Sequence, residues 1–217
     1  MDYHIKGTIA QYVSLGPDRG ETIWASNGSL VSYSKGISWK LAIPGGLSGA
    51  VRRSLSGEGI SLTQISATAP QQEVKLSANS PGHIIPWTLE NSAVITTRGS
   101  FLAAWGEVDI SVTVARRAGA AFFGGAGLFL QRIQGTGTVL VHGHGDLEER
   151  MLKPGEQLLV STGNLAAFGA DIDYDIEAVG SVRKFFFAGE GLFMTRVSGP
   201  GKVILQSLKP MSVVKAG

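Results

Sequence analysis

Apolar and polar residues alternate along much of this chain, in short runs separated by glycine. Alternate positions hold apolar side chains in three such runs, which places each pair on one face of an extended strand: Ile60 and Leu62, Leu128 and Leu130, Leu192 and Met194. Glycine or proline interrupts almost every longer window. The best candidate for a helical turn, residues 46–55, is short and rich in residues that break helices. The pattern therefore predicts an all-β fold with many short strands.

A glycine-led strand occurs three times in the sequence. Residues 125–133 match residues 189–197 at a spacing of 64, and a third copy, residues 57–65, lies 68 residues upstream of the second. In each copy a pair of glycines precedes the alternating apolar residues, and we expect these pairs to form structural turns: Gly57 and Gly59, Gly125 and Gly127, Gly189 and Gly191. Repetition of this kind is typical of folds built from one supersecondary unit.

Two further patterns repeat, and they fix the predicted order of the units. Residues 135–141 and 199–205 are 64 apart and are predicted to form hairpins, because a glycine turn leads directly into a second strand. A last pattern is shared by residues 28–33, 99–104 and 163–168. Its first copy lies near the amino terminus, so the chain is predicted to begin in the second half of a unit and to end after the first half of another.

We therefore predict three β-sandwich-like repeats in one compact domain: repeat one at 46–115, repeat two at 116–180, and repeat three assembled from 181–217 and 1–45. This arrangement predicts pairing between strands near 189–214 and strands near 3–42. Such pairing would close the three units and remove exposed sheet edges.

The composition agrees with a packed β protein. Of the 217 residues, 43% are hydrophobic and 17% charged, which argues against disorder, and the absence of cysteine excludes disulfides and thiolate metal sites. The first residues do not have the layout of a secretory signal, and no apolar stretch is long enough to span a bilayer, so we expect a cytoplasmic protein without a transmembrane segment. The net charge of +2 does not favour nucleic acid as a partner.

The candidate chemistry of this sequence is sparse. His142 and His144 occupy alternate positions on a predicted strand, as a metal site would need, with Asp146, Glu148 or Glu149 as a third ligand. The matching positions in the next copy are Gln206 and Leu208, so we favour an ordinary strand end or a contact between subunits. No serine elbow, phosphate-binding loop or dinucleotide fingerprint is present, and we therefore expect no catalytic residues and no cofactor.

Charged residues give further candidates. Paired basic residues precede each glycine turn and are candidates for binding anions or nucleic acid, although a solvated rim is the favoured interpretation: Arg52, Arg53, Arg116, Arg117, Arg183 and Lys184. Arg132 and Arg196 are equivalent, and we expect them to bridge strands or subunits rather than to bind an anion. In residues 171–177 the acids are expected to face water while the apolar residues between them face the core.

Several segments together resemble a known family: Leu47 to Glu58, Gly99 to Ala103, Leu152 to Glu156, Gly189 to Phe193 and Gly199 to Ser207. In these segments the chain is similar to the altered-inheritance-of-mitochondria-twenty-four family of mitochondrial biogenesis proteins. The resemblance implies a fold like the tryptophan RNA-binding attenuator protein, with three small β-sandwich units per chain and chains associating into a ring-like homotrimer. It implies no enzyme activity, and the ligands of the attenuator protein are not transferred.

From these observations we expect a non-enzymatic ring-forming scaffold or binding protein. Its expected partner is a further copy of itself, and another protein is a second candidate partner. The alternative is a nucleic-acid or small-ligand binding protein that uses the ring surface. A metal-dependent enzyme built around His142 and His144 is the third and least favoured hypothesis.

Overall fold

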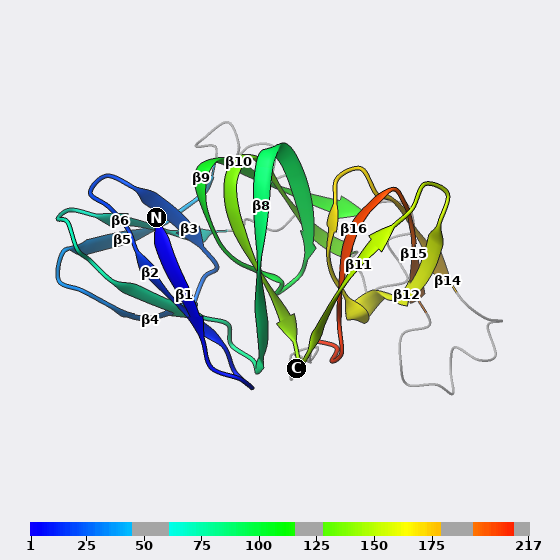
Figure 1. Ribbon diagram of the computed structural model, residues 1–217, viewed down its shortest axis with the longest axis horizontal. Helices are drawn as coiled ribbons and strands as arrows, with labels where there is room; N and C mark the ends of the chain where they lie inside the picture. Colours follow the sequence, from blue (N-terminus) through cyan, green and yellow to red (C-terminus); the bar gives the residue numbers. More distant parts are fainter. Residues whose placement is uncertain (45–60, 116–127, 179–192, 211–217) are drawn as a thin grey trace, which may run out of the picture.

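The computed structural model describes residues 1–44, 61–115, 128–178 and 193–210 (Figure 1). These residues form sixteen strands: β1 (Asp2–Lys6), β2 (Tyr12–Gly16), β3 (Thr22–Ala25), β4 (Leu30–Tyr33), β5 (Ile37–Ala42), β6 (Leu62–Ala67), β7 (Val74–Ser77), β8 (Gly82–Thr97), β9 (Phe101–Ala115), β10 (Leu128–His144), β11 (Leu147–Leu152), β12 (Gln157–Ser161), β13 (Leu165–Gly169), β14 (Asp173–Ala178), β15 (Phe193–Ser198) and β16 (Gly201–Gln206). The only helix in this part of the chain is a 3-10 turn, Thr162–Asn164. The prediction of an all-β fold is confirmed.

The strands form three groups that lie side by side along the long axis of the molecule (Figure 1). The N-terminal group comprises β1 to β7, the central group β8 to β10, and the C-terminal group β11 to β16. Among the described residues, no helix has the length and hydrophobicity that are needed to cross a lipid bilayer.

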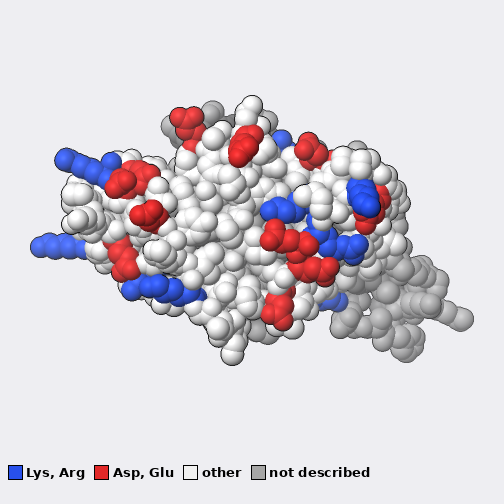
Figure 2. Space-filling view, in the orientation of Figure 1, with Lys and Arg blue, Asp and Glu red and all other residues white. Residues whose placement is uncertain are grey.

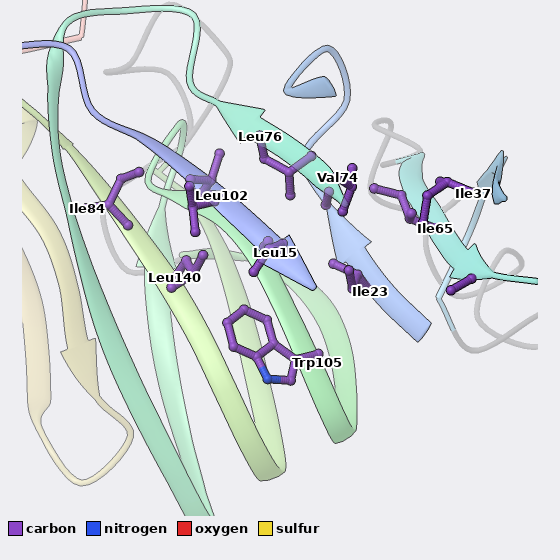
Figure 3. Close-up of a cluster of buried hydrophobic side chains, with 14 residues drawn as sticks. Leu15, Ile23, Ile37, Ile65, Val74, Leu76, Ile84, Leu102, Trp105 and Leu140 are labelled. Atoms are coloured by element: carbon purple, nitrogen blue, oxygen red, sulfur yellow. The ribbon is translucent and has the colours of Figure 1, made fainter. Parts of the chain in front are cut away.

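The N-terminal group is a sandwich of two layers. In one layer the order is β1-β2-β7-β4, and in the other β6 lies between β3 and β5. Alternate residues of these strands point into the space between the layers and form its core, which Figure 3 shows in part: Val13, Leu15, Ile23, Ile37, Ile65, Val74 and Leu76. Burial of these branched side chains is the main force that holds the two layers together.

The central group reaches the same two-layer form with only three long strands. β10 lies between β8 and β9, and all three strands turn over at the same level, near the top of Figure 1. At this level Gly137 is opposite Gly106, and Gly135 is opposite Ser92 and Val108. Each strand therefore contributes one half to each layer, and its core contains residues from both halves, among them Leu89, Val94, Phe101, Ile110, Ile133 and Val139.

Glycine is required at the turn of these strands. Gly106 and Gly135 have φ of 103° and 129°, which side chains rarely adopt. A Cβ on Gly106 would lie 2.7 Å from the Cα of Gly137, and a Cβ on Gly135 would overlap the carbonyl oxygen of Glu107. The close approach of β9 and β10 at the bend therefore excludes side chains at both positions.

The C-terminal group again has two layers. β16 lies between β11 and β13 in one layer, and β15 lies between β12 and β14 in the other. Its core is formed mainly by apolar residues from these strands, including Leu152, Val160, Leu165, Phe168, Ile176, Val197 and Val203. Edge-on pairing joins the three groups into one nine-stranded sheet with the order β11-β16-β13-β8-β10-β9-β3-β6-β5.

Two predictions about connectivity are wrong for the described strands. Strands near 189–214 were expected to pair with strands near 3–42, but β15 and β16 pair with β11 to β14, the strands that directly precede them, and bury Val197 and Val203 there. The glycine segments 135–137 and 199–201 are also not hairpin turns. At each of them the chain passes from one layer to the other, because the strands on either side belong to different layers.

Replacement of Gly135 by alanine tests the bend. We expect Gly135→Ala to lower the free energy of unfolding by about 2–4 kcal/mol, because it combines backbone strain with a collision against β9. The matched control is Gly155→Ala, where φ is also positive (78°) but a Cβ would meet no atom within 4 Å, and where we expect a loss of about 1 kcal/mol. Urea denaturation measures both values. Equal losses in the two variants would contradict the collision.

Candidate functional site

The junction between the N-terminal and central groups is a short antiparallel ladder. The outer edge of β3 pairs with the first half of β9 in the register Ile23 opposite Trp105, Trp24 opposite Ala104 and Ala25 opposite Ala103. Directly after β3, the backbone N–H of Ser26 donates to the carbonyl oxygen of Leu102 at 2.8 Å, and its hydroxyl donates to that of Phe101. A hydroxyl side chain therefore extends the ladder by one residue.

The junction between the central and C-terminal groups has the same form. The second half of β8 pairs with β13 in the register Thr96 opposite Ala167, Ile95 opposite Phe168 and Val94 opposite Gly169. Directly after Thr96, the hydroxyl of Thr97 lies 2.7 Å from the carbonyl oxygen of Leu165 and 3.2 Å from that of Ala166. Thr97 thus does for β13 what Ser26 does for β9.

A local irregularity marks the strands that receive these ladders. The pairing of β9 with β10 shifts its register after Phe101, and the pairing of β13 with β16 shifts after Leu165. The same shift occurs after Leu30, where β4 pairs with β7. These three residues occupy the same place in the repeated pattern of residues 28–33, 99–104 and 163–168. The bulge exposes carbonyl groups on the outer side of the strand, where Ser26 and Thr97 bind them.

Side chains also cross each junction. Trp24 and Leu62 of the N-terminal group pack against the core of the central group, and Ile95 and Leu130 of the central group lie in the core of the C-terminal group. Each buried residue of this size contributes about 1.5–3 kcal/mol. Residues of the following group contribute as well, since Ile84, Leu102, Trp105 and Leu140 of the central group lie in the core of the N-terminal group. The cores are therefore shared across both junctions.

The predicted histidine pair lies at the end of β10. His142 is 1% exposed, and neither of its ring nitrogens has a hydrogen-bond partner among the described residues. The ring of His144 lies edge-on to it at 5.5 Å between centroids, and its Nδ1 is 3.2 Å from Oε1 of Gln206. Burial, and to a smaller extent the nearby His144, lower the pKa of His142 to about 4 from its ordinary value of 6.5.

These contacts favour a structural role for the pair. Gln206, which matches His142 in the next copy, accepts a hydrogen bond from the backbone N–H of His144 at 3.0 Å and donates one to the carbonyl oxygen of Gly163 at 2.7 Å. His144 thereby links the central group to the C-terminal group. Asp146 lies 3.5 Å from a third histidine, His83. No cluster of three or more metal-ligating side chains is present in the described parts of the chain, so the structure gives no support to the metal site.

Of the other candidate residues, some are confirmed, Arg132 makes a different contact from the predicted one, and the rest lie outside the described residues. Arg196 forms an ion pair with Asp175 at 3.4 Å and bridges β15 and β14, which confirms its predicted role. Arg132 instead donates to Oε1 of Gln134 at 3.3 Å along its own strand. The alternation in residues 171–177 is confirmed, since Ile172 and Ile176 are buried and Asp171 and Asp173 are exposed.

The basic pairs, the three glycine pairs and the predicted helical turn lie outside the described residues: Arg52, Arg53, Arg116, Arg117, Arg183, Lys184, Gly57, Gly59, Gly125, Gly127, Gly189, Gly191 and residues 46–55.

An open cavity of about 610 Å³ lies at the bend of the central group. Polar side chains dominate its lining, including Arg132 and the carboxylates of Glu107, Asp109 and Asp171. None of the described residues that line it is a histidine. On the face drawn in Figure 2, basic side chains over the C-terminal group lie beside acidic ones. The C-terminal group contains ion pairs of this kind, Lys202–Glu149 and Arg150–Glu156.

Sequence reasoning missed the residues that form the two junctions. Ser26, Thr97 and Ser161 each follow an apolar pair and one further residue at the end of a strand, and Thr97 and Ser161 are 64 apart like the other copies. This shared hydroxyl was the available signal. It is weak, because serine and threonine are common at strand ends.

Replacement of His142 by glutamine tests the effect of its burial. The folded protein holds the neutral ring, so the unfolded chain binds a proton first as the pH falls, and stability is lost from about pH 6.5 down to about pH 4. We expect the wild type to lose up to about 3 kcal/mol more than His142→Gln between pH 7 and pH 4. Urea denaturation at several pH values measures this difference. His4→Gln, at an exposed position, should follow the wild type; identical pH profiles for His142→Gln and the wild type would refute the assignment.

Comparison with known proteins agrees with this architecture. The chain is 28% identical over 204 residues to an uncharacterised protein of Streptococcus pyogenes serotype M6, which covers 90% of this chain and 81% of that protein. A crystal structure of a protein from Streptococcus pyogenes superposes with a TM-score of 0.80 over 96% of this chain and 94% of that one, at 24% identity, and so shows the same fold. The model of the family described as "Mitochondrial biogenesis AIM24" matches residues 3–208. The chain therefore belongs to the mitochondrial biogenesis AIM24 family.

Proposed function

We propose that this protein is a non-enzymatic scaffold, built from three copies of one β-unit, that associates with itself into a ring-like homotrimer. The proposed units are contiguous, with boundaries near 1–81, 82–145 and 146–210, in place of the units at 46–115, 116–180 and 181–217 plus 1–45 that the sequence alone suggested. The cytoplasmic location and the likeness to the attenuator protein are part of the same proposal.

The order of strands supports this division. β7 lies between β2 and β4, the second half of β10 lies between the first halves of β8 and β9, and β16 lies between β11 and β13. In the other layer, β6 lies between β3 and β5, the first half of β10 lies between the second halves of β8 and β9, and β15 lies between β12 and β14. A single arrangement of six strand segments therefore recurs in all three groups, with β1 as an additional edge strand beside β2 in the N-terminal group.

The observation that carries the proposal is that the same junction is made twice within one chain. Each junction joins one kind of edge on a unit to a different kind of edge on the next unit, so it is a head-to-tail contact. Contacts of this type propagate until a ring closes or a filament forms. The polar groups at the junctions, Ser26 and Thr97, bind backbone carbonyls, a structural role that suits a scaffold.

Native mass spectrometry of the purified protein tests the proposal. We expect a species of three times the chain mass of 22.8 kDa, stable at micromolar concentration, without added metal or cofactor. A chain that stays monomeric at all concentrations would refute self-association. A mass increment from a retained small molecule or oligonucleotide would favour the alternative of a ligand-binding or nucleic-acid-binding protein.

A further inference from the structure

We infer that β4 of one copy of the chain pairs with β12 of a second copy, in the register used by the two internal junctions. The inference rests on the proposed self-association and specifies the surface through which it occurs. It is derived from the places that β4 and β12 occupy in the three groups.

β4 matches the strands that carry the register shift at the two internal junctions, β9 and β13, but no strand of the described residues pairs with its outer edge. It holds the position that the first half of β9 and β13 hold in the other groups, and it carries the same register shift after Leu30. The outer sides of β9 and β13 are paired with β3 and β8, whereas β4 is an edge strand in the part of the chain that the structure describes.

The burial of these three strands differs accordingly. Leu102 and Ala166 are at most 1% exposed, whereas the matching Val31 on β4 is 60% exposed. Ala104 and Phe168 are fully buried, whereas the matching Tyr33 is 50% exposed. Large apolar side chains at these positions are consistent with a surface that is covered in the assembled protein.

The core of the N-terminal group is also open on this side. Trp39 and Leu41 of β5 are 46% and 56% exposed, although they lie opposite the buried Ile65 and Thr63 and share their face of the sheet. Ile110 of β9, which occupies the place of Trp39 in the central group, is 2% exposed. The central core is closed on this side by Trp24 and Leu62 of the preceding group, and no described residue of this chain does the same for the N-terminal group.

β12 matches the other kind of junction strand, the one that carries the hydroxyl residue, and no described strand pairs with its outer edge. It holds the position of β3 and of the second half of β8, and it is an edge strand of its sheet within the described residues. Leu159 matches Ile95, but it is 53% exposed where Ile95 is 8% exposed. Met194 lies opposite Ser161, as Leu130 lies opposite Thr97, so it matches the second residue that crosses a junction.

A second copy of the chain fits these two edges, because β4 corresponds to β9 and β13, and β12 corresponds to β3 and β8, the strands that pair at the internal junctions. The internal registers predict three pairs between copies: Ser32 opposite Val160, Tyr33 opposite Leu159, and Ser34 opposite Leu158. The hydroxyl of Ser161 would then bind the carbonyl oxygen of Leu30, as Ser26 and Thr97 bind Phe101 and Leu165. β4 and β12 belong to the two groups at opposite ends of the molecule in Figure 1, so one chain can use both edges at once.

Cysteine pairs test the register, because the native chain has no cysteine. In Tyr33→Cys/Leu159→Cys the two thiols are expected to lie directly opposite each other across the interface and to form disulfides between chains on mild oxidation, giving covalent trimers on a non-reducing gel. The control is Tyr33→Cys/Gln157→Cys, two residues out of register, where the thiols are too far apart. We expect at least tenfold less cross-linking in the control.

Charge substitution tests the same surface without cross-linking. We expect Leu159→Lys to raise the dissociation constant of the oligomer at least tenfold, because the lysine would enter an apolar contact. The control, Met151→Lys, replaces an apolar residue that is 70% exposed on β11, outside the proposed contact, and should assemble like the wild type. Circular dichroism and thermal melting confirm that both variants fold.

The outcomes separate the inference from the proposed function. If the wild type is a trimer, but the opposed cysteines cross-link no better than the control and Leu159→Lys still assembles, then the inference is wrong and self-association stands. If the wild type is monomeric by native mass spectrometry, self-association itself fails. Preferential cross-linking together with dissociation of Leu159→Lys supports the inference.

Discussion

The structure depends on one constraint: none of its small β-sandwiches closes its own core. The central group needs Trp24 and Leu62 from the strands before it, and the C-terminal group needs Ile95 and Leu130. The core of one small sandwich is limited by its surface-to-volume ratio, so a shared core across a backbone ladder supplies apolar burial that a single unit lacks. The hydroxyls of Ser26 and Thr97 extend these ladders, and in this way packing and backbone hydrogen bonding coincide at the same few residues. A unit of this kind is stable as part of a series rather than alone.

The central group shows that the strand order matters more than the number of separate strands. Three strands of 15 to 17 residues fold over at one level and serve as six segments, whereas the C-terminal group uses six separate strands and the N-terminal group uses seven, with β1 as an added edge strand. Gly106, Gly135 and Gly137 allow the fold-over, because β9 and β10 approach each other too closely there for side chains. In the C-terminal group the corresponding change of layer occurs at Gly199 to Gly201 between β15 and β16. The same packing is thus reached with a continuous strand or with an interrupted one.

The repeated glycine-led pattern made the strands predictable, but not their partners. Of the alternating residues, Leu62 and Leu130 enter the core of the next group. Ile65, Ile133 and Val197, on the opposite face of the repeated strand, are fully buried. The prediction of hairpins failed because a glycine after a strand does not determine whether the next strand pairs with that strand or crosses to the facing sheet. The predicted pairing of the chain ends failed for a related reason, because a repeat can be divided into units at any point along the sequence. The hydrogen bonds between β6 and its neighbours β3 and β5 show that residues 62–67 belong with the strands before them. For the site, the sequence indicated His142 and His144 from their spacing, yet the junction residues were hidden because backbone ladders impose few demands on side-chain identity.

The contrast between His142 and Gln206 shows what the matching position requires. Gln206 satisfies both ends of its amide, with Gly163 and with His144, whereas the ring of His142 is buried with both nitrogens unpaired among the described residues. A glutamine therefore suits this place better than a histidine on hydrogen bonding alone. A metal ligand at this position would need further ligating groups nearby, and no group of three or more metal-ligating side chains is present among the described residues. The cost of burying His142 is then the cost of keeping an imidazole neutral in the central group, and this cost grows as the pH falls from about 6.5 to about 4, where the unfolded chain binds a proton and the folded protein does not.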